Sequence, residues 1–136
     1  ASKDVSAYFS KADNAAAPVV ILIHEWWGLN DNINAMAEDI RATGFHALAI
    51  DLFNGSVATD RDQAIVQTRA VKSDEAGATI SHWVRWARAV GKKDLLTTHW
   101  YTAGQAFATS TGGRYDQDDA ALAWARTHTF LATYLR

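Results

Sequence analysis

The chain has 136 residues, of which 49% are hydrophobic, and this length and composition fit one globular domain with a buried core. Its formal net charge of −2 gives no electrostatic basis for binding nucleic acid, and the lack of cysteine excludes disulfides, a thiolate nucleophile and zinc–sulfur sites. No apolar run approaches the roughly 18 residues that a membrane-spanning helix needs. We therefore expect a soluble, cytoplasmic protein that binds neither nucleic acid nor a membrane.

The first third of the chain predicts two strands and then a helix. Residues 5–9 alternate loosely between apolar and polar side chains, which favours a short edge strand. Residues 19–23 are a continuous, mostly β-branched run, which is typical of a strand buried on both faces. Asn30 or Asp31 can cap the helix that follows, and Gly44 supplies its end.

The rest of the chain continues this alternation. Residues 45–52 predict a second buried strand, which a helical crossover would place parallel to the first buried one. Asp60 and Ser73 can each cap a helix, and residues 95–101 are the last candidate strand. A final helix opens at Asp116, with a predicted apolar stripe of Ala121, Trp124, His128, Leu131 and Leu135. The sequence thus predicts an α/β fold with a small sheet of about four strands.

Two blocks of the sequence resemble the dienelactone hydrolase family of α/β-hydrolases. The first includes residues 24–31 (HEWWGLND) and 49–53 (AIDLF), and the second includes residues 99–101 (HWY) and 105–107 (QAF). Together the blocks span nearly the whole chain, so the resemblance implies one shortened domain over residues 1–136, with a cut-down, three-layer αβα form of the α/β-hydrolase fold. The segment that separates the blocks in longer family members is missing here, and the join lies near residues 89–91.

The missing segment carries the family's usual chemistry. Family members resemble other α/β-hydrolases in placing a nucleophile on an elbow of the form G-x-[CS]-x-G, and this pattern does not occur here. The triad aspartate belongs to the same missing segment. The position of the triad histidine aligns with Gln105, and an amide cannot act as a general base. Hydrolysis by a nucleophile–histidine–acid triad is therefore not expected.

The resemblance leaves one part of the site in place, namely the loop after the first buried strand. By similarity to the family, Glu25 would lie beside the reacting group and the backbone N–H of Trp26 would help to form an oxyanion hole. The alternative interpretation of Glu25 is a structural carboxylate that accepts hydrogen bonds from loop amides. The residues predicted to line a substrate site are Trp27, Tyr101, Gln105 and Arg114.

The five histidines offer no metal site. His24 is adjacent to Glu25, so on a strand the two side chains would point to opposite faces and could not readily hold one ion. A histidine hydrogen-bonded within the core is the favoured interpretation of His24. The other histidines lack ligand spacing, and we expect neither a metal nor a cofactor.

Losing the nucleophile strand would leave residues 19–23 without a neighbour on one side. Residues 95–101 could fill the vacancy, which gives the strand order 1-3-2-4 with the first strand antiparallel; alternatively, a second subunit or a swap between chains could supply the edge. We expect the first arrangement together with a homodimer. Three functions stay open, namely weak hydrolysis of small esters or lactones, non-catalytic binding of a small carbonyl or carboxylate ligand, and a remnant that only oligomerises.

Overall fold

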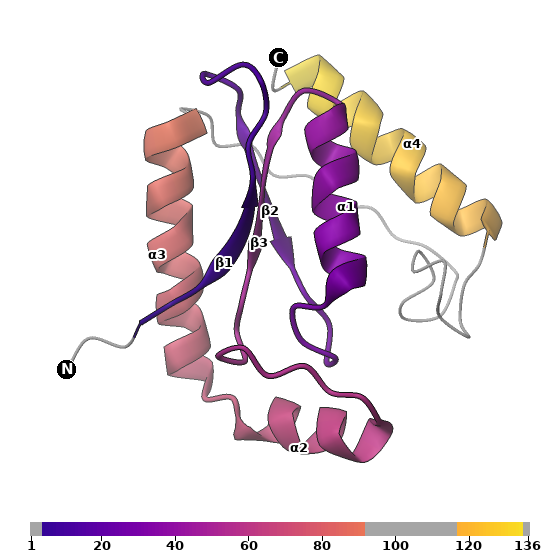
Figure 1. Cartoon of the computed structure of the whole chain (residues 1–136). Coiled ribbons are helices and arrows are strands. Elements are labelled where there is room, and N and C mark those ends of the chain that lie inside the picture. Colours follow the sequence, from indigo (N-terminus) through magenta and orange to yellow (C-terminus); the bar gives the residue numbers. More distant parts are fainter. Residues whose placement is uncertain (1–3, 92–116, 135–136) are drawn as a thin grey trace. The chain divides into compact units, whose positions relative to one another are not determined.

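The structure, a computed structural model, describes residues 4–91 and 117–134 (Figure 1). The chain divides into two compact units, Ala1–Lys92 and Lys93–Arg136. The elements of the first unit are β1 (Ala7–Ser10), β2 (Val19–Ile23), α1 (Asp31–Ala42), β3 (His46–Ile50), α2 (Arg61–Ala70) and α3 (Ser73–Gly91). The described helix of the second unit is α4 (Gln117–Tyr134).

The strands of the described residues form one sheet in the order β1-β3-β2. β1 runs antiparallel to β3, with Phe9 opposite Leu48, and β2 runs parallel to β3, with Ile21 opposite Leu48. This arrangement confirms the predicted order of the first three strands and the antiparallel direction of the first. The predicted fourth strand, residues 95–101, lies outside the described residues.

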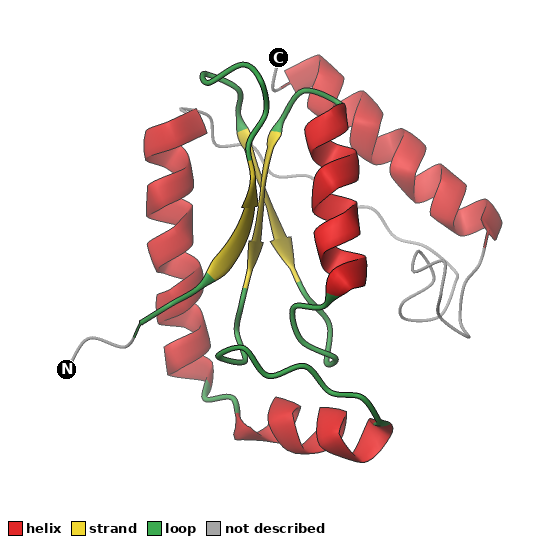
Figure 2. Ribbon diagram, viewed as in Figure 1, coloured by secondary structure: helices red, strands yellow, loops and turns green. Residues whose placement is uncertain are grey.

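α1 and α3 cover opposite faces of the sheet, which gives the predicted three layers (Figure 2). Successive side chains of a strand point to opposite faces, and on β3 the side chains of the two faces differ in size. His46 lies on the face toward α3, where the Phe9 ring contacts both His46 and Trp86, with centroids 5.4 Å and 5.1 Å apart. The other face carries only Ala47 and Ala49, which leaves room for α1 to pack close to the sheet.

The central strand of this sheet is β3, and this corrects the expectation that β2 is buried on both faces. Every residue of β3 is buried, whereas the first four residues of β2 are half-buried and Ile23 is 54% exposed. The reason lies in the strand order, since β3 has a strand on each side and β2 pairs with β3 alone among the described residues. An apolar β-branched run indicates a strand but does not fix its place in the sheet.

Local signals set the helix ends much as predicted. Asn30 caps α1 by accepting a hydrogen bond from the Ile33 amide at 3.2 Å, and Asp60 caps α2 by accepting one from the Gln63 amide at 2.9 Å. Gly44 follows α1 with φ +97°, a conformation that glycine adopts at little cost. These residues fix where α1 begins and ends and where α2 begins.

Glu38 of α1 ties this helix to the edge strand β1. Its carboxylate accepts hydrogen bonds from the hydroxyls of Tyr8 at 2.7 Å and Ser10 at 2.6 Å and from Arg41 Nε at 2.9 Å. The bonds from Ser10, Tyr8 and Arg41 stabilise the ionised form and lower the pKa of Glu38 to about 2. The same contact raises the pKa of Tyr8, because its phenol donates to the carboxylate.

α4 differs slightly from the predicted stripe. Leu131 is buried as predicted, whereas Ala121 and His128 are exposed and Ala120 is buried in place of Ala121. Leu135, the last residue of the predicted stripe, lies outside the described residues. Trp124 is half-buried, with its ring centroid 5.7 Å from that of His128. Within the described ranges, no helix is long and apolar enough to cross a membrane.

The Glu38 contact predicts a pH-dependent part of the stability. Because folding lowers the pKa of Glu38 from its ordinary 4.5 to about 2, its contribution is present above pH 4.5 and is lost as the pH falls toward 2. The melting temperature of the wild type should therefore fall more steeply between pH 5 and pH 2.5 than that of Glu38→Gln. Partial exposure of the carboxylate keeps this difference modest. Parallel pH profiles for the two proteins would contradict the assignment.

Candidate functional site

The loop between β2 and α1 holds Glu25, Trp26 and Trp27, at the carboxyl end of the parallel strands. Ile23, the last residue of β2, pairs with Ile50, the last residue of β3, so the loops that follow the two strands leave the sheet at the same edge. In open α/β sheets this edge is where ligands bind. The loop after β2 (residues 24–30) and the loop after β3 (residues 51–60) together form the candidate site.

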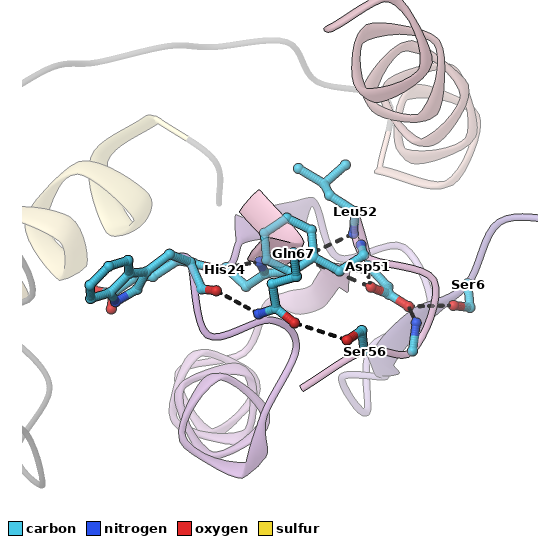
Figure 3. A network of polar contacts seen from close by, with 10 residues as sticks. Ser6, His24, Asp51, Leu52, Ser56 and Gln67 are labelled. Carbon is cyan, nitrogen blue, oxygen red and sulfur yellow. Dashed lines mark hydrogen bonds and ion pairs between the residues drawn. The ribbon is translucent and has the colours of Figure 1, made fainter. Parts of the chain in front are cut away.

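His24 connects the two loops through both ring nitrogens (Figure 3). Its Nε2 accepts a hydrogen bond from the Leu52 amide at 3.0 Å, and its Nδ1 lies 2.7 Å from the Glu25 carbonyl oxygen. An amide N–H can only donate and a carbonyl can only accept, so both contacts are satisfied by the neutral ring with its proton on Nδ1. The Nε2 atom also lies 3.9 Å from Asp51 Oδ1, but in this tautomer the contact is not an ion pair.

Asp51, at the end of β3, organises the loop that carries Leu52. Its Oδ1 accepts a hydrogen bond from the Phe53 amide at 2.8 Å, and its Oδ2 accepts bonds from the Gly55 amide and from the Ser6 hydroxyl (Figure 3). The carboxylate therefore folds its own loop into a turn and ties it to the start of the chain. All three contacts hold the loop in place, and we propose no acid or base role for Asp51.

Residues 25–28 form a tight turn that closes against the loop after β3. The Gly28 amide donates to the Glu25 carbonyl at 3.1 Å, and the Ala58 amide donates to the Trp27 carbonyl at 3.0 Å. Gly28 has φ +92°, and a Cβ atom at this position would overlap the carbonyl oxygen of Ser56. Glycine is thus required at position 28 both for its backbone conformation and for the close approach of the two loops.

Gln67 of α2 holds the next peptide of the turn. Its Nε2 donates to the Trp26 carbonyl at 2.6 Å, while its Oε1 accepts from the Ser56 hydroxyl at 2.9 Å (Figure 3). One amide side chain therefore ties α2 to both loops of the candidate site. This contact joins residues 41 positions apart in the chain.

These contacts fix the direction of two backbone amides. The peptides are trans, so each N–H points away from the carbonyl of its own peptide unit. The Glu25 carbonyl faces His24 and Gly28, which directs the Trp26 N–H to the other side, and the Trp26 carbonyl faces Gln67, which directs the Trp27 N–H away from α2. Neither amide donates a hydrogen bond to another residue within 4–91 and 117–134. Backbone N–H groups without an acceptor are the kind of donor that can bind an oxyanion or a carboxylate.

The turn also brings together the side chains predicted for the site. Glu25, Trp26 and Trp27 are all half-buried, and the two indole rings meet edge to face with centroids 5.3 Å apart. Tyr101, Gln105 and Arg114, the other predicted site residues, lie outside the described residues, so their roles stay predictions. The structure adds His24 and Gln67 as residues that hold the turn; only His24, next to Glu25, had a signal in the sequence.

A cavity of about 250 Å³ lies beside the site, between the loop after β3, the end of α2 and the start of α3. The ion pair between Lys72 Nζ and Glu75 Oε1, 3.3 Å apart, stands at its wall. Ser56 and Gln67 line this cavity, but Glu25, Trp26 and Trp27 do not. In the described part of the chain, no group of three or more histidine, aspartate or glutamate side chains could hold a metal ion.

Comparison with known proteins shows which family this chain is similar to. The model of the Dienelactone hydrolase family matches residues 5–94. A "Putative carboxymethylenebutenolidase" of Aquifex aeolicus (strain VF5) is 38% identical over 52 residues, which are 36% of this chain and 22% of that protein. "Protein usf" of Aquifex pyrophilus is 42% identical over 50 residues, which are 35% of this chain and 22% of that protein. The aligned part of the chain thus spans about a fifth of the length of each relative.

A solved structure extends the comparison to nearly the whole chain. The crystal structure of a "Putative Dienelactone Hydrolase" from Klebsiella pneumoniae subsp. pneumoniae MGH 78578 matches with a TM-score of 0.77 over 97% of this chain and 94% of that chain. The two sequences are only 14% identical, so this likeness establishes the fold, an α/β-hydrolase fold, and not the activity.

The close approach at Gly28 predicts a large cost for adding one methyl group. Gly28→Ala should lower the free energy of unfolding by about 2–5 kcal/mol, since it combines a strained backbone with overlap against Ser56. Gly44→Ala is the matched control, because Gly44 has nearly the same φ with no atom within 4 Å of the added Cβ, and should cost about 1–2 kcal/mol. Urea unfolding measures both; equal losses would show that the two loops do not meet at Gly28.

Proposed function

The chain belongs to the dienelactone hydrolase family, and from this premise we propose that its turn at Glu25 and Trp26 receives the carbonyl or carboxylate group of a small molecule and hydrolyses small esters or lactones slowly, without a triad. The observation that carries the proposal is the Trp26 amide, which follows the half-buried Glu25 and has no acceptor among the described residues. The α/β-hydrolase fold supports it, because the turn stands at the edge where such folds act.

The reaction proposed here differs from that of a triad enzyme. The sequence has no G-x-[CS]-x-G elbow, and Gln105 stands where the family's motif places the histidine. A covalent acyl-enzyme on such an elbow is therefore not part of the proposal. Loss of the triad is an inference from these residues, and it sets the expected rate low.

The proposed step uses water as the nucleophile. The Glu25 carboxylate takes a proton from a water molecule as that water's oxygen bonds to the ester carbonyl carbon, and the Trp26 N–H stabilises the negative charge that forms on the carbonyl oxygen. When the tetrahedral intermediate collapses, the bond to the alcohol oxygen breaks and that oxygen takes the proton from Glu25. The products are one carboxylic acid and one alcohol, or a hydroxy acid if the substrate is a lactone.

A second function, reversible binding without turnover, is favoured by the indole pair. Trp26 and Trp27 are both half-buried at the same turn and stack edge to face, which provides an apolar wall next to two backbone donors. A small aromatic carboxylate would place its ring on this wall and its charge at the amides. Such binding needs no nucleophile, so it is compatible with the absence of the triad.

We also propose that the protein forms a homodimer. β2 is an edge strand among the described residues, and Ile23 at its end is 54% exposed. An open strand edge with apolar side chains is a surface that folded proteins tend to cover. In the predicted order 1-3-2-4, the residues numbered 95–101 would cover the backbone edge of β2, so the second copy would pack on the apolar side chains that stay exposed, such as Ile23.

The catalytic proposal predicts a measurable but low esterase activity that depends on Glu25. Turnover of p-nitrophenyl acetate by the wild type should exceed that of Glu25→Gln by about 10²-fold or more, the usual contribution of a general base. Glu75→Gln is the matched control, since Glu75 lies in α3 and outside the turn, and it should keep the wild-type rate. If the wild type is no faster than Glu25→Gln, catalysis at this turn is excluded, and tryptophan fluorescence quenching by benzoate then tests the binding alternative.

The dimer proposal predicts the molecular mass in solution. Sedimentation equilibrium should give twice the chain mass for the wild type, and Ile23→Lys should shift the distribution to monomer, because it puts a charge in place of the exposed apolar side chain at the end of β2. A wild-type protein that is monomeric at every concentration tested would refute the proposal.

A further inference from the structure

His24 links the loop at the end of β3 to the peptide bearing the proposed oxyanion donor. It is buried, with 1% of its side chain exposed, and each ring nitrogen has a backbone partner, the Leu52 amide on one side and the Glu25 carbonyl on the other. We propose that His24 is a positioning residue, which directs the Trp26 N–H by holding the carbonyl of the same peptide. This inference rests on the function proposed above.

The geometry of a peptide makes the link direct. The Glu25 carbonyl and the Trp26 N–H belong to one planar trans unit, so whatever holds the carbonyl oxygen also sets the direction of the N–H. Among the described residues, two donors hold this oxygen, the His24 Nδ1–H at 2.7 Å and the Gly28 amide at 3.1 Å. Rotation of the peptide would break both bonds and would turn the Trp26 N–H toward the His24 ring, away from the side on which a ligand could reach it.

The His24 ring is itself held in the tautomer that this role needs. Its Nδ1 can donate to Glu25 only if the proton sits there, and the Leu52 N–H donating to Nε2 selects that tautomer. The Phe53 ring, which meets the imidazole edge to face with centroids 4.6 Å apart, limits the movement of the His24 ring. The position of the Leu52 amide is set in turn by the loop that Asp51 folds. In the wild type, the loop after β3 therefore selects the tautomer in which His24 can hold the Glu25 carbonyl.

His46 shows that such bonding is not by itself a mark of the site. Its Nδ1 accepts from the Ala12 amide at 3.0 Å, and its Nε2 lies 3.2 Å from the Ala15 carbonyl oxygen, so this ring also bridges two backbone groups. His46 stands at the start of β3, however, whereas the candidate site follows the end of that strand. His46 is therefore a suitable control for His24, because both histidines are buried and bonded to backbone groups, but His46 does not contact the turn.

Two substitutions of His24 separate its two contacts. The side-chain nitrogen of asparagine can take the place of Nδ1 and donate to the Glu25 carbonyl, but it leaves the Leu52 amide without an acceptor. The side-chain oxygen of glutamine can take the place of Nε2 and accept from Leu52, but it removes the side-chain donor from the Glu25 carbonyl and leaves the Gly28 amide bond in place. A purely structural histidine would make both variants alike, whereas a positioning role requires that asparagine rescue what glutamine loses.

The test combines two-dimensional ¹H–¹⁵N NMR of the full chain with p-nitrophenyl acetate turnover. His24→Gln should move the Trp26 amide resonance and lower turnover by about tenfold or more, a part of the 10²–10³ that one oxyanion donor contributes. His24→Asn should keep the Trp26 resonance near its wild-type position, and His46→Gln should leave the Trp26 resonance and turnover unchanged even if it lowers the melting temperature. Equal Trp26 shifts in the two His24 variants, or no shift in either, would overturn the proposal.

A measurement on the wild type covers the case in which a variant does not fold. The imidazole ¹⁵N shifts of His24 should report a proton on Nδ1, and a proton on Nε2 would overturn the proposal. The amide shifts also separate this inference from the proposed function. If Trp26 responds to His24→Gln but the wild type has no esterase activity, His24 positions the amide and the catalytic proposal is wrong. If the wild type is active and Trp26 does not respond, the positioning role is wrong.

Discussion

The hydrogen bond from the Leu52 amide to the His24 ring joins the loops that leave the carboxyl ends of β3 and β2. Parallel pairing brings these two strand ends to one edge of the sheet, but pairing alone does not shape the loops beyond it. The ring of His24 accepts this bond and also holds the Glu25 carbonyl. Gly28 and Gln67 hold the rest of the turn against the same neighbouring loop. The direction of the Trp26 amide, on which the proposed function depends, follows from these contacts.

Features set by neighbours along the chain could be predicted from the sequence. Asn30 and Asp60 cap helices because their side chains reach amides three residues ahead, and residues 46–50 form a strand within the predicted range. The place of each strand in the sheet could not be read in this way, since the apolar run of β2 looks as buried as β3 but lies at the edge of the described sheet. That difference arises from tertiary pairing.

The same distinction explains what was missed at the candidate site. Glu25 and Trp26 could be named through a contiguous motif, whereas Gln67 lies 41 residues from the carbonyl that it holds, on a helix whose sequence shows only a cap and an apolar face. The sequence favours the interpretation of His24 as a core histidine. It is buried as expected, and the structure adds that its bonding partners belong to the turn. Burial and a positioning role are therefore compatible in one residue.

The central claim is that the turn after β2 presents the Trp26 amide to a small carboxylate or carbonyl group. Titration of ¹⁵N-labelled protein with benzoate, followed amide by amide, tests this claim without requiring any turnover. The Trp26 and Trp27 amides should show the largest saturable shifts, with smaller changes at Gly28 and at the indole N–H groups of the same turn. Shifts confined to residues outside the turn, such as those around Lys72 and Glu75, or no saturable shift at Trp26, would contradict it.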